Sequence, residues 1–187
     1  PENINLISAH TYEKDIKNIR DVDLIIEAVV EDEKIKNNVY KTISPYIQNN
    51  AILTSNTSGI SLSNLEKSLP DNLKERFMIT HFFNPPRYMH LLELVRGNYT
   101  SSETYKTISE FGENVLEKGI VHAKDTPNFI GNRIGVYVLM ATMHIANKHG
   151  LNIEEIDALT GAISGRPKSA SFRTCDIIGL DTLKNVA

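Results

Sequence analysis

The first 124 residues alternate short apolar runs with longer segments in which apolar residues recur every three or four positions. Short, nearly continuous apolar runs are typical of strands buried on both faces of a parallel sheet. Their alternation with amphipathic helices predicts an α/β fold with a largely parallel sheet. We expect strands at residues 22–30, 51–53, 77–80, 91–95 and 120–121.

Helical periodicity marks the segments between these runs. Residues 31–47 and 102–118 each predict one amphipathic helix, and a shorter helix is expected after Ser61 or Ser63, either of which can cap it. In the first of these helices the predicted apolar face consists of Ile35, Val39, Ile43 and Ile47.

After residue 124 the pattern becomes entirely helical. Asp125 or Thr126 is the expected N-cap of a helix over residues 129–148, with Pro127 near its start. Gly150 is expected to end that helix, and Asn152 to cap the next one. We therefore predict two domains, an α/β domain at residues 1–124 and an all-α domain at residues 125–187, with further helices at 153–159 and 172–178.

Composition excludes several classes of function. The formal net charge is −3, from 20 basic and 23 acidic residues, and no basic stripe suggests a nucleic-acid partner. No apolar stretch is long enough to span a bilayer. The single cysteine, Cys175, excludes an internal disulfide and a thiolate zinc cluster, and it fits a reducing cytoplasm. The chain begins at Pro1 without Met, so we expect a piece of a longer protein whose helical domain is cut short at Ala187.

Polar residues follow three of the predicted strands. Glu31, Ser58 and His81 each come soon after an apolar run. The carboxyl ends of parallel strands meet at one edge of a sheet, so these three side chains can share a crevice. A carboxylate close to a histidine can hold the imidazole in one tautomer and stabilise its charged form, and Glu93 is the candidate for this role.

Each of these residues also has a structural interpretation. A lone histidine is more often structural than catalytic, and Glu93 can face solvent on an edge strand. Ser58 can cap the following helix, and Asn132 can bond to backbone rather than to a ligand. Glu31 can be a first-turn acid, and Lys36 can be solvated.

Four motifs occur in order along the chain, and each by itself is weak. They are IEAVVE at 26–31, SNTS at 55–58, HFFNP at 81–85 followed by Glu93, and DTPNFIGNR at 125–133. Together they closely resemble the L-3-hydroxyacyl-CoA dehydrogenase family, from about Asp21 to the end of the chain. The tail at 165–174 resembles the version found in multifunctional fatty-acid oxidation enzymes, in which this dehydrogenase is fused to an enoyl-CoA hydratase.

The resemblance implies a Rossmann-like NAD-binding domain followed by a helical domain, with the active site in the cleft between them. It implies that NAD oxidises a 3-hydroxyacyl-CoA to a 3-ketoacyl-CoA in fatty-acid β-oxidation. It also implies a homo-oligomer, because helical domains of this family commonly form dimers. Metal ions are not expected to take part. The roles implied are His81 as general base, Glu93 as its partner, Ser58, Asn84 and Asn132 at the substrate, and Glu31, Lys36, Asn56 and Ser58 at the cofactor.

The chain departs from the family at its start. Gly59 is its first glycine, so the glycine-rich turn that binds the cofactor pyrophosphate is absent. We therefore expect only the C-terminal half of the Rossmann-like domain, weak NAD binding and little or no turnover by this chain alone, and an unpaired strand edge prone to association. Two alternatives stay open: another Rossmann-plus-helical hydroxy acid dehydrogenase, many of which use a lysine as acid–base, or a non-catalytic dimerising fragment.

Overall fold

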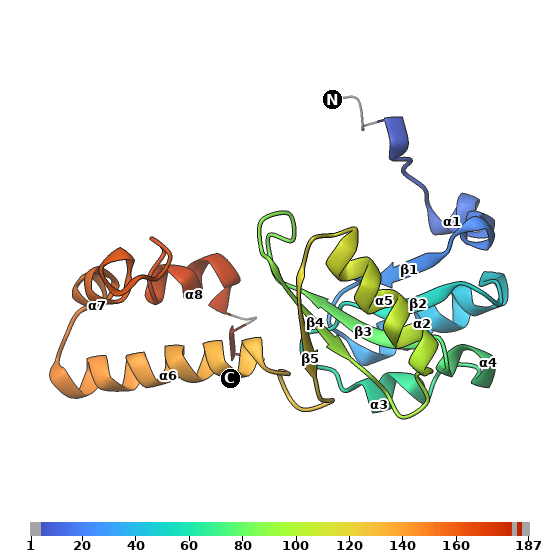
Figure 1. Ribbon diagram of the computed structural model, residues 1–187. Coiled ribbons are helices and arrows are strands. Elements are labelled where there is room, and N and C mark those ends of the chain that lie inside the picture. Colours follow the sequence, from blue (N-terminus) through green and yellow to red (C-terminus); the bar gives the residue numbers. More distant parts are fainter. Residues whose placement is uncertain (1–4, 181–182, 185–187) are drawn as a thin grey trace. The chain divides into compact units, whose positions relative to one another are not determined.

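The computed structural model describes residues 5–180 and 183–184 (Figure 1). The chain divides into two compact units, Pro1–Pro127 and Asn128–Ala187, and each is described by itself. The expectations attached to the chain's first and last residues lie outside the described residues.

The first unit contains a five-stranded sheet with the strand order β1-β2-β3-β4-β5. Three of its four strand pairings are parallel, which confirms the prediction of a largely parallel sheet. The strands are β1 (Leu24–Glu27), β2 (Ile52–Ser55), β3 (Phe77–Phe82), β4 (Leu91–Val95) and β5 (Gly119–Ala123).

The pairing of β3 with β4 is antiparallel. The connection between them covers only residues 83–90, whereas a parallel connection needs about a dozen residues or more, usually with a helix. In this register His81 lies directly opposite Glu93. His81 is therefore inside β3, and the expectation that it follows the end of the strand was wrong because its ladder with β4 extends the strand to Phe82.

Helices cover both faces of the sheet (Figure 1). On one face, Ile108 of α5 packs with Met78, Leu92 and Leu94 in a buried cluster. On the other face, Tyr40 of α2 makes an edge-to-face ring contact with Phe77. The helical segments of this unit are α1 (Tyr12–Asp15), η2 (Ile16–Asp21), α2 (Glu33–Ile43), η3 (Ser44–Tyr46), α3 (Leu62–Glu66), α4 (Asp71–Lys74) and α5 (Ser102–Asn114).

Helix α2 corrects the predicted apolar face. Asp32 caps the helix by accepting a hydrogen bond from the Ile35 amide, and Ile35 itself is 45% exposed. The buried residues of α2 are Lys36, Tyr40 and Ile43, so Ile43 is the fully buried member of the predicted face. Apolar periodicity missed Lys36 and Tyr40 because they are buried through polar contacts.

Strand β1 is shorter and more exposed than expected. Its neighbour among the described strands is β2, so it forms an edge of the sheet. Ile26 is 43% exposed and Val30 is 64% exposed. The expectation of burial on both faces was wrong here because α5 packs on the cluster at the centre of the sheet and not over the carboxyl end of β1.

The second unit is helical, as predicted. It contains α6 (Gly131–His149), α7 (Ile153–Thr160), η4 (Ala162–Ser164) and α8 (Phe172–Ile178). Gly150 ends α6 in the left-handed conformation with φ of 65°, and Asn152 forms a capping box with Glu155 on α7. Both predicted helix boundaries are confirmed.

The predicted cap of α6 is wrong. Ile130, and not Asp125 or Thr126, occupies the N-cap position of this helix. The carboxylate of Asp125 accepts hydrogen bonds instead from the amides of Leu62 and Ser63, at 2.8 and 3.0 Å, and so caps α3 in the first unit. Ser61 caps the same helix through the Asn64 amide.

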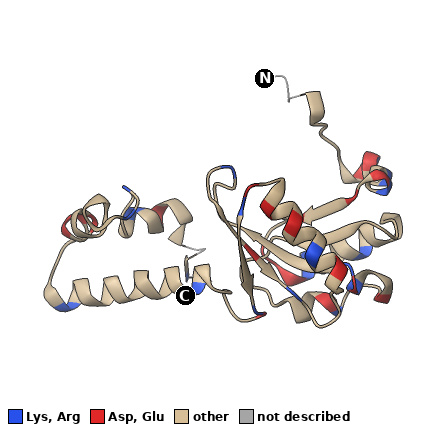
Figure 2. Cartoon of the chain, in the orientation of Figure 1, with Lys and Arg blue, Asp and Glu red and all other residues tan. Residues whose placement is uncertain are grey.

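Helix α6 carries no charged residue between Arg133 and Lys148 (Figure 2). Ile134 and Ile145 on this helix are 60% and 53% exposed. Despite this apolar character, none of the helices in the described residues is both long enough and apolar enough to cross a membrane.

Candidate active site

The imidazole of His81 and the carboxylate of Glu93 face each other across the β3–β4 ladder. Directly opposed residues in an antiparallel ladder project to the same face of the sheet. His81 Nδ1 lies 2.7 Å from Glu93 Oε2, and the two residues are only 3% and 0% exposed. The interpretation of Glu93 as a solvent-facing edge residue is therefore wrong, because β4 lies between β3 and β5.

The second ring nitrogen of His81 lies beside Ser58. Nε2 is 3.2 Å from Ser58 Oγ, and the ring of Phe83 packs against the imidazole with a centroid distance of 4.6 Å. When Nδ1–H donates to the Glu93 carboxylate, Nε2 keeps its lone pair and accepts the Ser58 hydroxyl proton in a hydrogen bond. A histidine held in this way can take up a proton at Nε2, while the carboxylate stabilises the resulting cation.

Asn56 fixes the carboxyl ends of three strands relative to one another. Its Oδ1 accepts a hydrogen bond from the Phe82 amide at the end of β3, at 2.9 Å. Its own amide donates to the carbonyl of Glu27 at the end of β1, at 2.8 Å. Asn56 directly follows β2, so these two bonds set the starting point of the turn that carries Ser58.

Glu31 holds the same turn from the side of β1. Its Oε1 accepts hydrogen bonds from the Thr57 hydroxyl at 2.6 Å and from the amides of Ser58 and Gly59, each at 2.9 Å. Burial raises the pKa of Glu31, but these bonds and the charge of Lys36 outweigh burial, so the pKa lies below its ordinary value. Glu31 precedes the cap of α2, so the interpretation as a first-turn acid of that helix was wrong.

A second buried carboxylate, Glu27, received no role in the sequence analysis. Its Oε1 accepts from the Lys36 ammonium and the Val29 amide, both at 2.8 Å. Its Oε2 accepts from the hydroxyls of Tyr40 at 2.7 Å and Ser55 at 2.6 Å. One sequence signal for this cluster was available: Glu27 is the only carboxylate inside the apolar run at 24–30.

Lys36 is the cation of this cluster and is only 1% exposed. Its Nζ lies 2.8 Å from Glu27 Oε1 and 3.3 Å from Glu31 Oε2. The interpretation of Lys36 as a solvated residue was therefore wrong. Burial and the charge of Glu27 raise the pKa of Tyr40, so its hydroxyl remains a donor to that carboxylate.

Two other predicted site residues belong to other segments of the chain. Asn84 is exposed in the connection after β3, where it precedes a cis peptide bond to Pro85. Asn132 is partly buried in the first turn of α6, in the second unit. Their roles at the substrate stay predictions.

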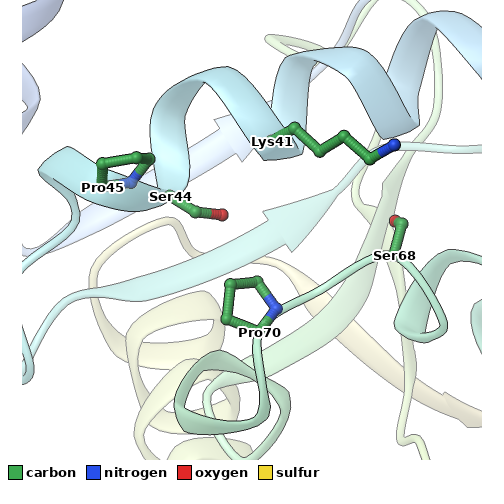
Figure 3. A pocket seen from close by; sticks show the side chains of 5 residues that line it. All are labelled: Lys41, Ser44, Pro45, Ser68 and Pro70. Atoms are coloured by element: carbon green, nitrogen blue, oxygen red, sulfur yellow. The ribbon is translucent and has the colours of Figure 1, made fainter.

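A hollow of about 310 Å³ is lined by residues outside this network (Figure 3). It adjoins the carboxyl end of α2, whereas Lys36 and Glu31 lie toward the amino end of that helix. The residues that line it are Lys41, Ser44, Pro45, Ser68 and Pro70. Among the described residues, no group of three or more histidine, cysteine or acidic residues is arranged to hold a metal ion.

Comparison with known proteins matches each of the two units to a known domain. Residues 2–126 match the model of the 3-hydroxyacyl-CoA dehydrogenase NAD binding domain, and residues 129–187 match the model of the C-terminal domain of the same enzymes. A solved structure, (S)-3-hydroxybutyryl-CoA dehydrogenase from Ralstonia eutropha, has a TM-score of 0.82 at 30% identity. That likeness covers 95% of this chain and 60% of the solved chain.

Two relatives with the name probable 3-hydroxyacyl-CoA dehydrogenase show the same likeness in sequence. The protein from Bacillus subtilis is 44% identical over 100% of this chain, and the protein from Deinococcus radiodurans is 41% identical over 97%. The chain spans 24% and 53% of the length of these two relatives. The resemblance drawn from the four motifs is confirmed: the chain belongs to the 3-hydroxyacyl-CoA dehydrogenase family.

Proposed function

We propose that the protein carrying this chain oxidises a 3-hydroxyacyl-CoA to the 3-ketoacyl-CoA with NAD, as a step of fatty-acid β-oxidation. The observation that carries the proposal is the line of three side chains in which Glu93 holds Nδ1 of His81 and Ser58 faces Nε2. Family membership supports the class of reaction, and the match of residues 2–126 to an NAD binding domain supports the cofactor.

His81 is the proposed general base. Hydride leaves the C3 carbon of the substrate readily only if the proton on its hydroxyl leaves as well, and an alcohol is a very weak acid. Nε2 accepts that proton, and the positive charge that forms on the ring is balanced by the buried Glu93 carboxylate. In the reverse direction the same ring returns the proton to the oxygen.

Ser58 marks the position of the reacting oxygen. Its hydroxyl lies within hydrogen-bond distance of Nε2, so a substrate oxygen placed next to both groups is oriented toward the base. We assign Asn132 a second hydrogen bond to that oxygen and Asn84 a contact with the substrate. Both assignments rest on the family motifs.

The carboxyl ends of β1 and β2 are the proposed binding place for the nicotinamide and ribose end of NAD. These strands are parallel and end at one edge of the sheet, where the exposed Val30 offers an apolar surface near the turn of Ser58. Asn56 and Ser58 are the proposed wall on the nicotinamide and ribose side. The family motifs assign Glu31 and Lys36 to the same wall, but Glu31 is bonded to the Ser58 turn and Lys36 is only 1% exposed. When bound, NAD accepts the hydride.

The described edge does not supply the pyrophosphate site, because no glycine-rich turn occurs in the 187 residues. We expect a polypeptide limited to these residues to bind NAD weakly, and calorimetric titration measures this directly. Micromolar affinity would show that the turn is dispensable for binding.

The proposed partners follow from the same family. An acyl-CoA is the substrate, and a second copy of the chain is the expected partner of the helical unit. The B. subtilis relative is about four times as long as the matched region, so it has room for further domains, and the tail at 165–174 favours fusion to an enoyl-CoA hydratase. The single cysteine supports a reducing compartment, and we place the protein in the cytoplasm.

The direct test uses the intact protein and acetoacetyl-CoA as the probe. We expect NADH to be oxidised in its presence, and not with acetoacetate that lacks the CoA group. A protein that forms dimers in sedimentation but does not oxidise NADH would be the non-catalytic alternative. The alternative with a lysine acid–base is disfavoured because Lys36 of this network is held by Glu27 and Glu31.

A further inference from the structure

A buried row of charges connects the centre of β1 with the turn that carries Ser58. Glu27 Oε1 lies 2.8 Å from Lys36 Nζ, and the same ammonium lies 3.3 Å from Glu31 Oε2. Glu27 and Lys36 are 4% and 1% exposed, while the side chain of Glu31 is 43% exposed. The row therefore begins in the core and ends at the surface of the strand edge.

The outer end of the row is bonded to the protein at both carboxylate oxygens. Oε1 of Glu31 accepts three hydrogen bonds from three consecutive residues, Thr57, Ser58 and Gly59. Oε2 faces Lys36. A carboxylate that receives several donors from one turn fixes the backbone of that turn, since each charge-assisted bond is stronger than a neutral one.

We propose that Glu31 is a positioning residue for Ser58, and that Glu27 and Lys36 hold Glu31 in place for this purpose. The carboxylate fixes the amide of Ser58, and the hydroxyl of the same residue faces His81 Nε2 at 3.2 Å. We call Glu27, Lys36 and Glu31 together the clamp. This inference rests on the proposed function, because the clamp serves catalysis only if His81 is the general base. It also changes the expected role of Glu31 from a contact with the cofactor to the support of a catalytic turn.

The inner part of the row makes the clamp rigid. A buried ammonium needs a counter-charge, and Lys36 has one on each side. Glu27 is itself fixed by the hydroxyls of Tyr40 and Ser55 and by the Val29 amide. The position of Glu31 is therefore set by groups on β1, β2 and α2.

The first experiment measures amide hydrogen exchange by NMR on the full 187-residue chain, without substrate or cofactor. In Glu31→Ala we expect exchange at Ser58 and Gly59 to be about tenfold faster or more, because these amides lose their acceptor. In Glu31→Gln the effect is intermediate, since one side-chain oxygen still accepts. Asp32→Asn is the matched control: it neutralises the adjacent carboxylate, which bonds to the Ile35 amide in α2. Exchange at Ser58 and Gly59 should not change in this control.

The second step of the row is tested with Glu27→Gln. The carboxylate of Glu27 does not bond directly to Ser58 or Gly59, but the Ser55 hydroxyl that donates to it also accepts from the Thr57 amide at 3.3 Å. Ser55→Ala is therefore the matched control for this second route. Faster exchange at Ser58 and Gly59 in Glu27→Gln, with no change in Ser55→Ala, would show that the effect passes through Lys36 and Glu31. If this variant does not fold, the Glu31 variants still decide the outcome. Unchanged exchange at both amides in Glu31→Ala would overturn the proposal.

Kinetics on the intact protein separate a clamp from a cofactor contact. For Glu31→Ala we expect kcat to fall by about 10- to 100-fold with the KM for NADH little changed, because a displacement of about 1 Å near the reacting atoms costs up to about 100-fold. A raised KM for NADH at unchanged kcat would assign Glu31 to the cofactor and overturn the clamp.

The two proposals fail in different ways. If the unmodified intact protein does not oxidise NADH with acetoacetyl-CoA, the proposed function fails, whatever exchange shows. If it does so and exchange at the turn is insensitive to Glu31, the positioning role fails and the dehydrogenase remains.

Discussion

Two carboxylates are buried on the same face of the sheet, and they are used differently. Glu27 on β1 is bonded to the ammonium of Lys36, and Glu93 on β4 is bonded to the imidazole of His81. The carboxylates are 4% and 0% exposed, so burial does not distinguish them. The difference lies in the nitrogen group that each carboxylate faces.

A lysine ammonium carries its charge throughout the neutral range, whereas an imidazole ordinarily titrates near a pKa of about 6.5. The pair at Glu27 is thus a fixed ion pair, to which two hydroxyls and an amide also donate. The pair at Glu93 supports a group that can gain and lose a proton. The same type of acid therefore serves stability at β1 and, in the proposed function, chemistry at β4.

The largest expected effect comes from removing the proposed general base. His81→Gln in the intact protein should lower kcat by about 100- to 10,000-fold, which is the usual contribution of a positioned general base. The dissociation constant for NADH should change little, since the pyrophosphate and adenosine ends are bound elsewhere. Steady-state kinetics with acetoacetyl-CoA and a separate NADH titration measure the two quantities.

A second histidine provides the control for this substitution. His122 is an exposed residue on β5 whose ring is bonded to the Tyr105 hydroxyl at 2.7 Å. His122→Gln should leave kcat unchanged. Equal losses of turnover and cofactor binding in His81→Gln would indicate a structural histidine instead.

The next largest effect is expected from breaking the ion pair between Glu27 and Lys36. Glu27→Ala leaves the buried Lys36 without its nearest counter-charge, and we expect the free energy of unfolding to fall by about 3–5 kcal/mol. The double variant Glu27→Leu with Lys36→Met should regain much of that loss, because it removes both charges together. Urea unfolding monitored by circular dichroism measures these changes. Additive losses in the double variant would contradict the assignment of an ion pair.

A third buried carboxylate sharpens the comparison. Glu66 of α3 is 3% exposed, and within the described part of the chain its Oε1 has no hydrogen-bond partner. A Cβ atom added at Gly97 would lie 2.0 Å from that oxygen, so the space around it is closed. Burial raises the pKa of Glu66, and the charge of Asp125 raises it further.

This direction fixes the sign of a pH effect. The folded state holds the Glu66 proton more tightly than the unfolded state does, so stability falls as pH rises from the ordinary value of 4.5 through the folded-state pKa. We expect Glu66→Gln to be more stable than the parent by about 1 kcal/mol at neutral pH, since the amide has no charge to desolvate. The difference should vanish below the ordinary pKa.

Urea unfolding of parent and variant at neutral and at acidic pH measures this small effect. Glu75→Gln is the control, because Glu75 is exposed at the end of α4 and should show no such dependence on pH. A stability difference that is the same at both pH values would exclude titration of Glu66 as its cause.

Local patterns predicted the strands and most helices because the burial of this chain follows periodicity. The antiparallel pairing of β3 with β4 could also have been predicted, since the connection at 83–90 is too short for a crossover helix. The polar face of α2 was not predicted, because apolar periodicity does not register a lysine buried by Glu27. The cap formed by Asp125 was missed for another reason: its acceptors and donors lie far apart in the sequence.

The candidate site was predicted where a motif placed two complementary residues close in the chain, as with His81 and Glu93. It was not predicted where the function of a residue depends on what surrounds it. Glu31 resembles a helix-opening acid in the sequence, and only the fold shows that three donors of a distant turn converge on it.

The register of β3 against β4 makes the position of His81 independent of the loop that follows β3. Four consecutive residue pairs fix the ladder from Ile79 opposite Val95 to Phe82 opposite Leu92. The alignment of His81 with Glu93 is therefore set by the strands and not by the length of the connection at 83–90. An insertion in that loop can therefore change the surface beside these two residues in the course of evolution, while the ladder keeps the imidazole and the carboxylate 2.7 Å apart.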